Sequence, residues 1–187
     1  ARLTRCLDEF QPDVVFHLAA QSLVRVGYER PLETLDTNIM GTANLLEALR
    51  TAVRGRRCSV VVVTSDKCYE NRGWVHGYRE TDPVGGRDPY SVSKGAAELL
   101  VNAWRDSYFP PEGISVHGVV VATARAGNVI GGGDWAKDRI VPDCIAALTA
   151  GTPIAVRNPA ARRPWQHVLE ALSGYLHLGT AMLTVGL

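Results

Sequence analysis

A tyrosine and a lysine lie four residues apart in the segment Tyr90-Ser-Val-Ser-Lys94, directly after a proline. Residues four apart on a helix share one face, so the ammonium group would lie beside the phenol. A nearby positive charge stabilises phenolate and lowers the pKa of a tyrosine, which can then serve as a general base. The spacing is common by chance, and in isolation a solvent-exposed pair is the simpler interpretation. The surrounding residues therefore decide what the pair indicates.

A polar cluster follows the valine-rich run that precedes this helix. Residues 58–64 predict a buried strand, and Ser-Asp-Lys comes directly after it. A hydroxyl at a strand end, beside a Tyr/Lys pair, is suited to oxidising an alcohol carbon or reducing a carbonyl carbon. We therefore predict catalytic roles for Ser65, Asp66, Lys67, Tyr90 and Lys94.

The rest of the chain alternates between helical and strand patterns. Helical spacing of apolar residues covers 1–10, 31–50, 89–108, 138–150 and 167–182, and short apolar runs predict strands at 13–20, 58–64, 114–125 and 153–157. Strands separated by helices indicate βαβ units and a parallel sheet covered on both faces. The fold class is therefore α/β, a Rossmann-like doubly wound sheet. Gly151 is expected to cap the helix that precedes it.

Three connecting segments are expected to meet in one crevice. The segments 21–30, 65–88 and 126–137 each leave from the carboxyl end of a predicted strand. Ligands of open α/β sheets bind beyond those ends. Long ordered connections in a compact domain are usually functional, which strengthens this expectation.

Composition limits the class of protein. With 46% hydrophobic and 21% charged residues, the chain is neither disordered nor fibrous. A net charge of +1 gives no basic surface for nucleic acid. Four cysteines without a Cys-x-x-Cys pair indicate free thiols in the cytoplasm rather than disulfides or a metal site, and Cys68 is interpreted as a packing residue. The apolar stretch 171–187 is interpreted as a core helix, so no membrane contact is expected.

Several motifs, in order along the chain, resemble the extended branch of the short-chain dehydrogenase/reductase superfamily, which acts on nucleotide sugars. They are His17-Leu-Ala-Ala-Gln21, the helix 37–47 with Asn38, the trio Ser65, Tyr90 and Lys94, the segment Arg125-Ala-Gly-Asn-Val-Ile-Gly131, and Arg163-Pro-Trp-Gln-His-Val168. Within that branch, the segments 65–71, 131–139 and 157–170 are most similar to the CDP-glucose 4,6-dehydratases. The related dTDP-glucose enzymes place Thr-Asp-Glu where this chain has Ser65-Asp66-Lys67.

The resemblance implies NAD as cofactor and CDP-glucose as substrate. It implies cofactor contacts for His17, Ala19, Ala20, Asn38, Tyr90 and Lys94, and substrate contacts for Gln21, Ser22, Asn128, Arg139 and Arg163, the last as a phosphate ligand. Residues 1–126 would belong to the NAD-binding domain and 127–187 to the start of a small substrate-binding domain. We also expect an internal fragment of a longer enzyme, with the Gly-rich phosphate-binding turn before residue 1.

A 4,6-dehydration assigns a task to each catalytic candidate. Tyr90, tuned by Lys94, would take the C4 hydroxyl proton while Ser65 hydrogen-bonds the C4 oxygen. Asp66 and Lys67 would act as the acid at the C6 oxygen and the base at C5. A lysine base must be neutral, which requires a depressed pKa. The simpler alternative for Lys67 is an ion pair with Asp66 or Glu70, and His17 has the simpler alternative of only ending a strand.

Other functions remain open at this point. A nucleotide-sugar 4-epimerase or decarboxylase would share the scaffold, although it would not need the acid and base at positions 66 and 67. A non-catalytic dinucleotide-binding protein would not need both Tyr90 and Lys94. The family also pairs the helices 31–50 and 89–108 between subunits. Apolar residues on several sides of these helices, including Leu46, Leu99, Leu100 and Trp104, therefore predict a homodimer or a higher homo-oligomer of the full-length protein.

Overall fold

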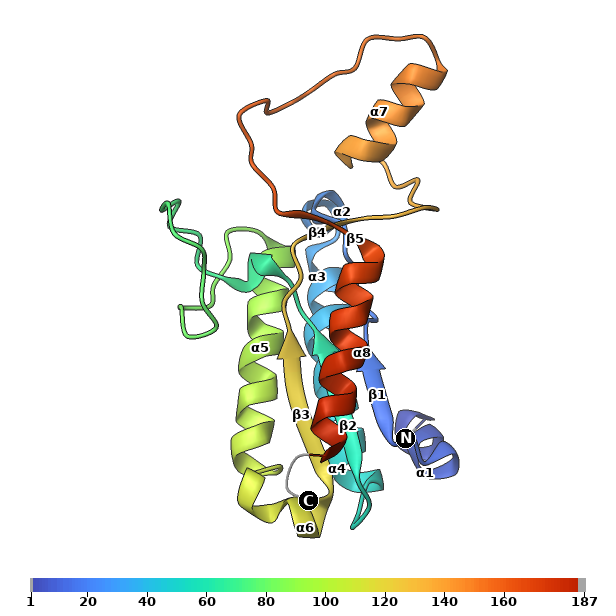
Figure 1. Cartoon of the computed structure of the whole chain (residues 1–187), viewed down its shortest axis with the longest axis vertical. Coiled ribbons are helices and arrows are strands. Elements are labelled where there is room, and N and C mark those ends of the chain that lie inside the picture. The colour runs from blue at the N-terminus through green and yellow to red at the C-terminus, as the bar shows by residue number, and fades with distance from the viewer. Residues whose placement is uncertain (1, 185–187) are drawn as a thin grey trace.

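A three-stranded parallel sheet forms the centre of the protein. The computed structural model describes residues 2–184. Strands β1 (Val14–His17), β2 (Cys58–Val63) and β3 (Val119–Ala124) lie in that order, and Val60 pairs with Val15 on one side and Val121 on the other. Helix α8 lies in front of the sheet and α4 behind it (Figure 1). This arrangement confirms the predicted α/β class with a parallel sheet.

The helices connect and cover these strands. Their bounds are α1 (Arg2–Phe10), α2 (Val24–Glu29), α3 (Pro31–Leu35), α4 (Gly41–Ala52), α5 (Pro89–Ser107), α6 (Ile114–His117), α7 (Ile140–Thr149) and α8 (Val168–Thr184). A π-helical turn, η1 (Asp36–Met40), joins α3 to α4, and two 3-10 turns, η2 (Asp66–Cys68) and η3 (Pro111–Gly113), follow β2 and α5. The predicted helix over 31–50 is thus one helical stretch with a wider turn in its middle.

The core lies between the sheet and helices α4 and α5. Alternate residues of β2 and β3 pack with the buried leucines of α4 and with Val101 of α5. A strand presents every second residue to one face, which is why Val60 and Val62 belong to this core together. Leu46, named above as a candidate interface residue, is fully buried here, and Leu100 and Trp104 pack against the same cluster. The apolar residues on these two helices therefore serve mainly their own sheet.

Helix α8 returns to the first sheet after the chain has left it. It contacts all three strands, and it approaches β1 so closely that a Cβ at Gly179 would lie 3.0 Å from the Phe16 ring. The stretch 171–184 does form a helix on the sheet, but only Ala171, Gly179 and Met182 are buried, and Leu176 is 60% exposed. The prediction of a buried core helix is therefore wrong in burial, because one face of α8 covers the sheet and the other is exposed. Residues 185–187 of the predicted stretch lie outside the described residues. The domain division at residue 126 stays a prediction, although α8 lies with the elements that precede it.

Two strand predictions are wrong. Residues 114–117 form helix α6, which Gly118 ends in the left-handed region at φ +74°, and strand pairing begins only at Val119. Residues 153–157 are exposed and form no strand, because no other strand pairs with them among residues 2–184. A second, two-stranded parallel sheet of β4 (Asn128–Ile130) and β5 (Trp165–His167) was not predicted. Gly151, at φ +64°, does cap α7 as expected.

Candidate active site

The end of β2 meets the first turns of α5 through three consecutive residues. The Ser65 hydroxyl is hydrogen-bonded to Tyr90, the Val63 carbonyl accepts from the Lys94 ammonium at 3.1 Å, and the Thr64 hydroxyl donates to Glu98. Tyr90, Lys94 and Glu98 are four residues apart, so each belongs to the next turn of one helix face. Asp88 caps this helix through the Ser91 amide at 3.0 Å, and Pro89 occupies its first turn. Local helix signals thus bring the predicted trio together.

The phenol of Tyr90 is held in a buried setting, with 8% of the residue exposed. Burial raises the pKa of Tyr90, the hydrogen bond with Ser65 lowers it in part, and the charge of Asp66 raises it further. The net pKa is raised, contrary to the expectation that Lys94 lowers it. The reason is geometric, because the Lys94 ammonium donates to the Val63 carbonyl and desolvation dominates at the phenol.

Lys94 is itself a buried cation, with 7% of the residue exposed. Burial lowers its pKa, while the neighbouring Cys68 and Glu98 raise it in part. An ammonium has three N–H donors, and the one that bonds within residues 2–184 goes to Val63. Two donors are therefore available to hydroxyl groups of a ligand at the strand ends.

Asp66 and Lys67 form an ion pair at the start of η2. Asp66 Oδ1 accepts from the Lys67 ammonium at 3.1 Å and from the Ser65 hydroxyl at 3.0 Å. The simpler alternative for Lys67, an ion pair with Asp66, is therefore present. Both side chains are about one-third exposed, and Lys67 and Ser65 line the same cavity as Tyr90. The pair thus lies beside the predicted base.

Asn38 connects three segments from inside the π-helical turn. Its amide nitrogen donates to Ser93 Oγ at 2.8 Å and to the Gln21 carbonyl at 3.0 Å, and its oxygen accepts from the Gln21 amide at 2.8 Å. Ser93 in turn donates to the Tyr90 carbonyl at 2.7 Å. Asn38 therefore positions the loop after β1 against the first turn of α5, and its direct cofactor contact stays a prediction. Turns of the π type often occur at functional sites.

Of the other predicted residues in this loop, one makes hydrogen bonds within the protein and the others are accessible to a ligand. The side-chain amide of Gln21 forms hydrogen bonds with the Leu23 backbone and the Thr34 hydroxyl. Gln21 does not line the cavity, so its substrate contact stays a prediction. Ser22 lines the cavity. Ala19 is exposed and Ala20 half-exposed, so small side chains leave the backbone beyond β1 accessible. A close approach by a flat ligand is possible there.

His17 ends β1 and contacts Thr42, with Nε2 and Oγ1 3.2 Å apart. The Thr42 hydroxyl donates its only hydrogen to the Asn38 carbonyl at 2.7 Å. His17 Nε2 must therefore be the donor, which leaves Nδ1 without a proton in the neutral ring. Burial, followed by the charge of Lys94, lowers the pKa of His17 and favours that neutral form.

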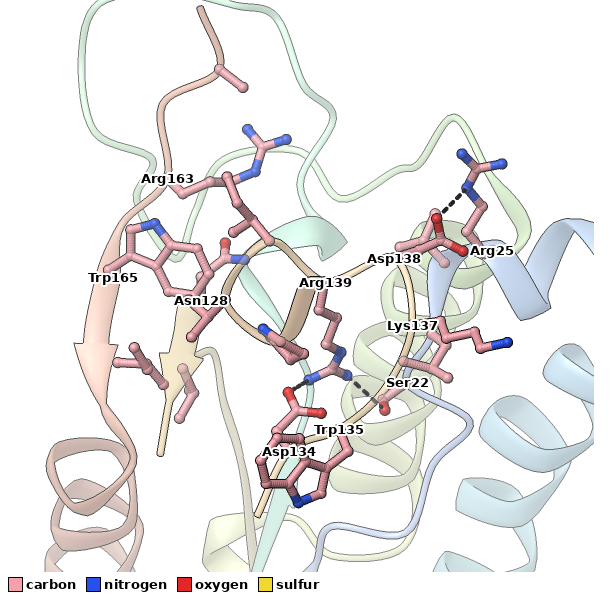
Figure 2. A pocket seen from close by; sticks show the side chains of 18 of the residues that line it. Ser22, Arg25, Asn128, Asp134, Trp135, Lys137, Asp138, Arg139, Arg163 and Trp165 are labelled. Atoms are coloured by element: carbon pink, nitrogen blue, oxygen red, sulfur yellow. Dashed lines mark hydrogen bonds and ion pairs between the residues drawn. The ribbon is translucent and has the colours of Figure 1, made fainter. Parts of the chain in front are cut away.

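A cavity of about 840 Å³ opens beside these groups. Its lining comes from residues 22–28, from Ser65, Lys67 and Tyr90, and from two later segments, 127–145 and 155–165. The volume is that of a site for a small organic ligand. The predicted convergence of the three connecting segments is therefore confirmed. Figure 2 shows the side chains on its wall.

Three predicted substrate residues line this cavity from its later segments. Arg139 bridges Asp134 at 2.9 Å and Ser22 at 3.3 Å, so it connects the loop after β4 to the loop after β1 (Figure 2). Asn128 Oδ1 is buried and has no hydrogen-bond partner among the described residues, so it is an acceptor that a ligand donor would satisfy. Arg163 is exposed and donates to the Arg162 carbonyl at 2.7 Å. Its role as a phosphate ligand stays a prediction.

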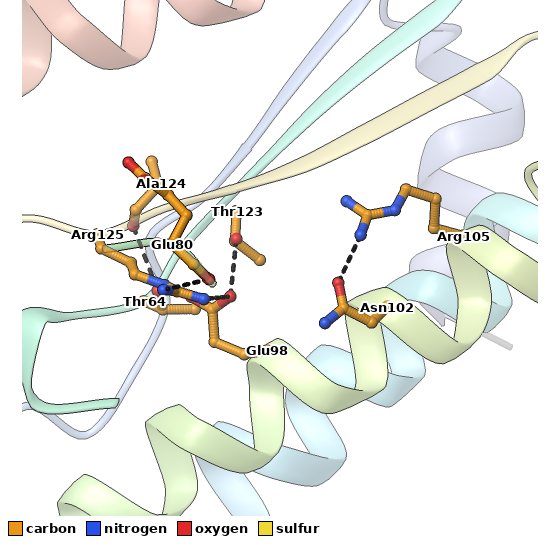
Figure 3. A network of polar contacts seen from close by, with 8 residues as sticks. All are labelled: Thr64, Glu80, Glu98, Asn102, Arg105, Thr123, Ala124 and Arg125. Carbon is orange, nitrogen blue, oxygen red and sulfur yellow. Dashed lines mark hydrogen bonds and ion pairs between the residues drawn. The ribbon is translucent and has the colours of Figure 1, made fainter. Parts of the chain in front are cut away.

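A buried ion pair that was not predicted joins Glu98 of α5 to Arg125, the residue after β3 (Figure 3). Glu98 is 1% exposed and accepts two hydrogen bonds from Arg125, at 3.0 and 2.8 Å. Arg125 belongs to the segment predicted to meet the substrate, but its guanidinium turns away from the cavity to Glu98. The signal available in the sequence was the spacing of Glu98, two helical turns beyond Tyr90 on the same face.

Comparison with known proteins places this geometry in a family. The sequence profile of the family described as GDP-mannose 4,6-dehydratase matches residues 1–180. The chain belongs to this family. A CDP-glucose 4,6-dehydratase from Salmonella typhimurium is 54% identical over 185 residues, which are 99% of this chain and 51% of that protein. A dTDP-glucose 4,6-dehydratase from Xanthomonas campestris is 33% identical over 177 residues, covering 91% of this chain and 48% of that protein.

Solved structures agree with the family assignment. The structure of MoeE5 in complex with UDP-glucose and NAD matches with a TM-score of 0.80 and 27% identity, over 97% of this chain and 56% of that chain. The resemblance to nucleotide-sugar dehydratases and the Rossmann-like fold, both predicted from the motifs, are thereby confirmed. The chain spans about half the length of these family members.

Neither a metal site nor a membrane span is found in the part of the chain that the structure describes. No group of three or more metal-ligating side chains occurs among residues 2–184. None of the described helices is both long and apolar enough to cross a bilayer.

Proposed function

We propose that the full-length protein converts CDP-glucose to CDP-4-keto-6-deoxyglucose, with NAD as cofactor. The observation that carries this proposal is the meeting of Ser65, Lys67 and Tyr90 on one wall of the cavity. A hydroxyl, a phenol and an acid/base pair side by side match the proton transfers of a 4,6-dehydration. The 54% identity to the Salmonella enzyme named for CDP-glucose supports the choice of nucleotide.

The described residues fit a nicotinamide dinucleotide at the strand ends. Lys94 has two N–H donors without a partner among residues 2–184, and Ala19 and Ala20 leave the backbone after β1 open. MoeE5, which this chain resembles, is described in complex with NAD. When bound, NAD would accept a hydride from C4 and return it to C6. Lys94, Tyr90 and the residues after β1 would hold the cofactor there, and His17 would stay neutral beside it.

Tyr90 and Ser65 act at the C4 oxygen of the sugar in this proposal. The phenol removes the hydroxyl proton, and the Ser65 hydroxyl holds the oxygen through a hydrogen bond. Burial raises the pKa of Tyr90, so phenolate must be stabilised by charge that arrives with the ligands. The oxidised nicotinamide ring carries such a positive charge. The base would therefore become effective only in the loaded site.

Asp66 and Lys67 together supply the acid and the base of the elimination. Their ion pair, with one hydrogen bond of 3.1 Å, is one proton shift away from a neutral amine beside a carboxylic acid. The amine removes the C5 proton, which the C4 ketone has made acidic, and the acid protonates the departing C6 oxygen. The C5–H and C6–O bonds break, water leaves, and the ion pair is restored. Once a hydride has returned to C6, the Lys67 ammonium gives a proton back to C5, and the proton that Tyr90 took from the C4 hydroxyl makes up for the one lost with water. The resting ion pair is thus compatible with catalysis.

The remaining wall of the cavity would hold the nucleotide diphosphate. Arg139 and Arg163 are cations on that wall, and Asn128 presents an unpartnered buried oxygen. Guanidinium groups bind phosphate oxygens in a bidentate way. A cytoplasmic location belongs to the proposal, supported by four cysteines that are free in the described structure.

The experiment that tests this proposal incubates the full-length protein with CDP-glucose and NAD. We expect a 4-keto-6-deoxy product without net accumulation of reduced cofactor, and no comparable turnover of dTDP-glucose or GDP-mannose. Tyr90→Phe should abolish every step. A product that keeps its C6 hydroxyl but has inverted C4 would contradict dehydration and favour an epimerase. Turnover of another nucleotide sugar at the same rate would contradict the choice of CDP-glucose.

We also propose that the full-length protein is a homodimer through the outer face of α5. Val92 and Leu99 are seven residues apart on this helix, and Leu99 is 58% exposed. Residues at this spacing lie on one helix face, which is the geometry of a helix-pairing seam. The π-helical turn before α4 adds Met40, another exposed apolar side chain.

A further inference from the structure

The ion pair between Glu98 and Arg125 connects the helix that carries Tyr90 and Lys94 to the ends of two strands. The two oxygens of Glu98 accept from four donors: Arg125 Nε and Nη2, the Thr64 hydroxyl, and the Thr123 hydroxyl at 2.8 Å. These donors come from the ends of β2 and β3, while the acceptor belongs to α5 (Figure 3). One carboxylate therefore joins three elements at a single point.

This point lies close along the chain to Ser65 and Lys94, two of the predicted catalytic residues. Thr64 directly precedes Ser65, and Glu98 is one helical turn from Lys94. The Asp66 amide donates to the carbonyl of Ala126, the residue after Arg125, at 3.0 Å. A displacement of Glu98 relative to the strand ends would therefore change the distance between the Ser-Asp-Lys cluster and Tyr90.

Arg125 extends the same connection to the loop that follows the cluster. Its guanidinium lies 4.7 Å from the centre of the Tyr69 ring and donates to the Glu80 carbonyl at 3.3 Å. Tyr69 stacks on Tyr78, with ring centres 4.8 Å apart. Arg125 thus adds a side-chain connection between the strand ends and the loop over residues 69–82.

The buried carboxylate of Glu98 is stabilised in its charged form by the donors around it. Burial would raise the pKa of Glu98, but the hydrogen bonds from Arg125, Thr64 and Thr123 lower it below its ordinary value. A buried ion pair is weak evidence for stability, since apolar side chains of similar size often serve as well or better. Glu98 lies one helical turn from Lys94 and bonds Thr64, the neighbour of Ser65. This place suggests a task other than stability.

We propose that Glu98 and Arg125 are positioning residues for the reaction, which hold the Ser65-Asp66-Lys67 cluster at its working distance from Tyr90 and Lys94. This inference rests on the proposed function for its substrate, but not for its geometry. A misplacement of about 1 Å in an active site can cost on the order of 10²-fold in rate. Loss of the pair should therefore lower kcat by about 10²-fold and leave KM nearly unchanged.

The test uses the full-length protein with three variants. Glu98→Gln leaves Arg125 without its partner charge, which is expected to destabilise the protein. The double variant Glu98→Met/Arg125→Met removes both charges and retains apolar packing, which is expected to preserve folding. Glu47→Gln is the matched control, because Glu47 also accepts two hydrogen bonds from an arginine, Arg50, on the exposed surface of α4.

Urea unfolding first gives the unfolding free energy of each variant. Two further measurements are then made on each folded variant, the steady-state constants with CDP-glucose and NAD, and amide hydrogen exchange without ligands. We expect the double variant to keep the unfolding free energy but to lose about 10²-fold in kcat. Exchange should be faster at residues 64–68 and unchanged in α1 and α4. Glu47→Gln should resemble the parent in both measurements. A double variant with parental stability and parental kcat would overturn the inference.

The outcomes also separate this inference from the proposed function. If the parent protein does not turn over CDP-glucose, the proposed function fails, and hydrogen exchange alone decides on the pair. Faster exchange at the strand ends would then support the positioning role, and unchanged exchange in the double variant would overturn it. If the parent turns over CDP-glucose, both measurements must change together for the inference to stand.

Discussion

The side-chain amide of Asn38 donates a hydrogen bond of 2.8 Å to the hydroxyl of Ser93, across 55 residues of sequence. The Ser93 hydroxyl in turn donates to the carbonyl of Tyr90, so the π-helical turn holds the first turn of α5 in place. The same side chain also donates to the backbone carbonyl of Gln21 and accepts from its backbone amide. Asn38 thus connects the cofactor side of the sheet to the proposed base.

Replacement of Asn38 by alanine should destabilise the full-length protein by about 1–3 kcal/mol, because Ser93 and the Gln21 backbone would lose their partner. Urea unfolding measures this change. Asn102→Ala is the control, since Asn102 bonds only the half-buried Arg105 on the outer part of α5, and its effect should stay within about 0.5 kcal/mol. Equal losses in the two variants would contradict the special place of Asn38.

Lys67→Met should separate the oxidation from the elimination. The variant keeps Ser65 and Tyr90, so the C4 hydroxyl can still be oxidised, but no amine remains to take the C5 proton. Product formation should fall by about 10²–10⁴-fold. Nicotinamide absorbance should rise in a single turnover, and deuterium should not enter C5. Arg72→Met, which removes the nearby exposed pair with Glu70, serves as the control. Parental C5 exchange in the Lys67 variant would assign the base elsewhere.

Leu99→Glu should convert a dimeric full-length protein to a monomer. The substitution puts a charge at the centre of the proposed apolar seam, whereas the side chain is too exposed to support the core. Sedimentation velocity measures the change. Leu176→Glu, at a residue that is 60% exposed on α8, should leave the dimer intact. A parent protein that sediments as a monomer at micromolar concentration would remove the proposal.

Cys58 and Cys68 should resist alkylation in the folded protein. Burial raises the pKa of Cys58 to about 11 and that of Cys68 to about 12, so almost no thiolate is present at pH 8. Mass spectrometry of peptides should find both thiols unmodified in native protein and modified in urea. Cys6, which is exposed, is the internal control. Rapid native labelling of Cys68 would indicate a reactive thiol beside the site rather than a packing residue.

Acid should weaken the protein partly through His17. Its pKa is lowered in the folded state from the ordinary value of 6.5, so on acidification the unfolded chain binds this proton first. The contribution of the neutral ring is therefore complete above pH 6.5 and is lost as the pH falls through the lowered pKa, with a slope of at most about 1.4 kcal/mol per pH unit. His17→Asn should flatten that slope in urea titrations between pH 7 and 5, and His76→Asn, at an exposed residue, should not. Parallel slopes in the parent and the His17 variant would exclude this role.

The sequence determined the features that depend on neighbours along the chain. The spacing of Tyr90 and Lys94, the proline before them and the valines of β2 are local signals, and each identified its element and its place in the site. The family motifs were likewise contiguous. Strand predictions failed where pairing with another strand decides the outcome. Residues 153–157 have the composition of a strand but no partner strand among the described residues, whereas the short strands β4 and β5 are stabilised by pairing with each other.

Only the tertiary structure decided which groups the polar side chains contact. Gln21 and Asn38 were predicted as ligand residues, yet their amides bond the protein, and Arg125 turns to Glu98 instead of the cavity. The Lys94 ammonium contacts the Val63 carbonyl, and burial raises the pKa of Tyr90. The physical reason is the same in each case. A buried polar group must find a partner, and that partner is set by the packing of distant segments rather than by spacing along the chain.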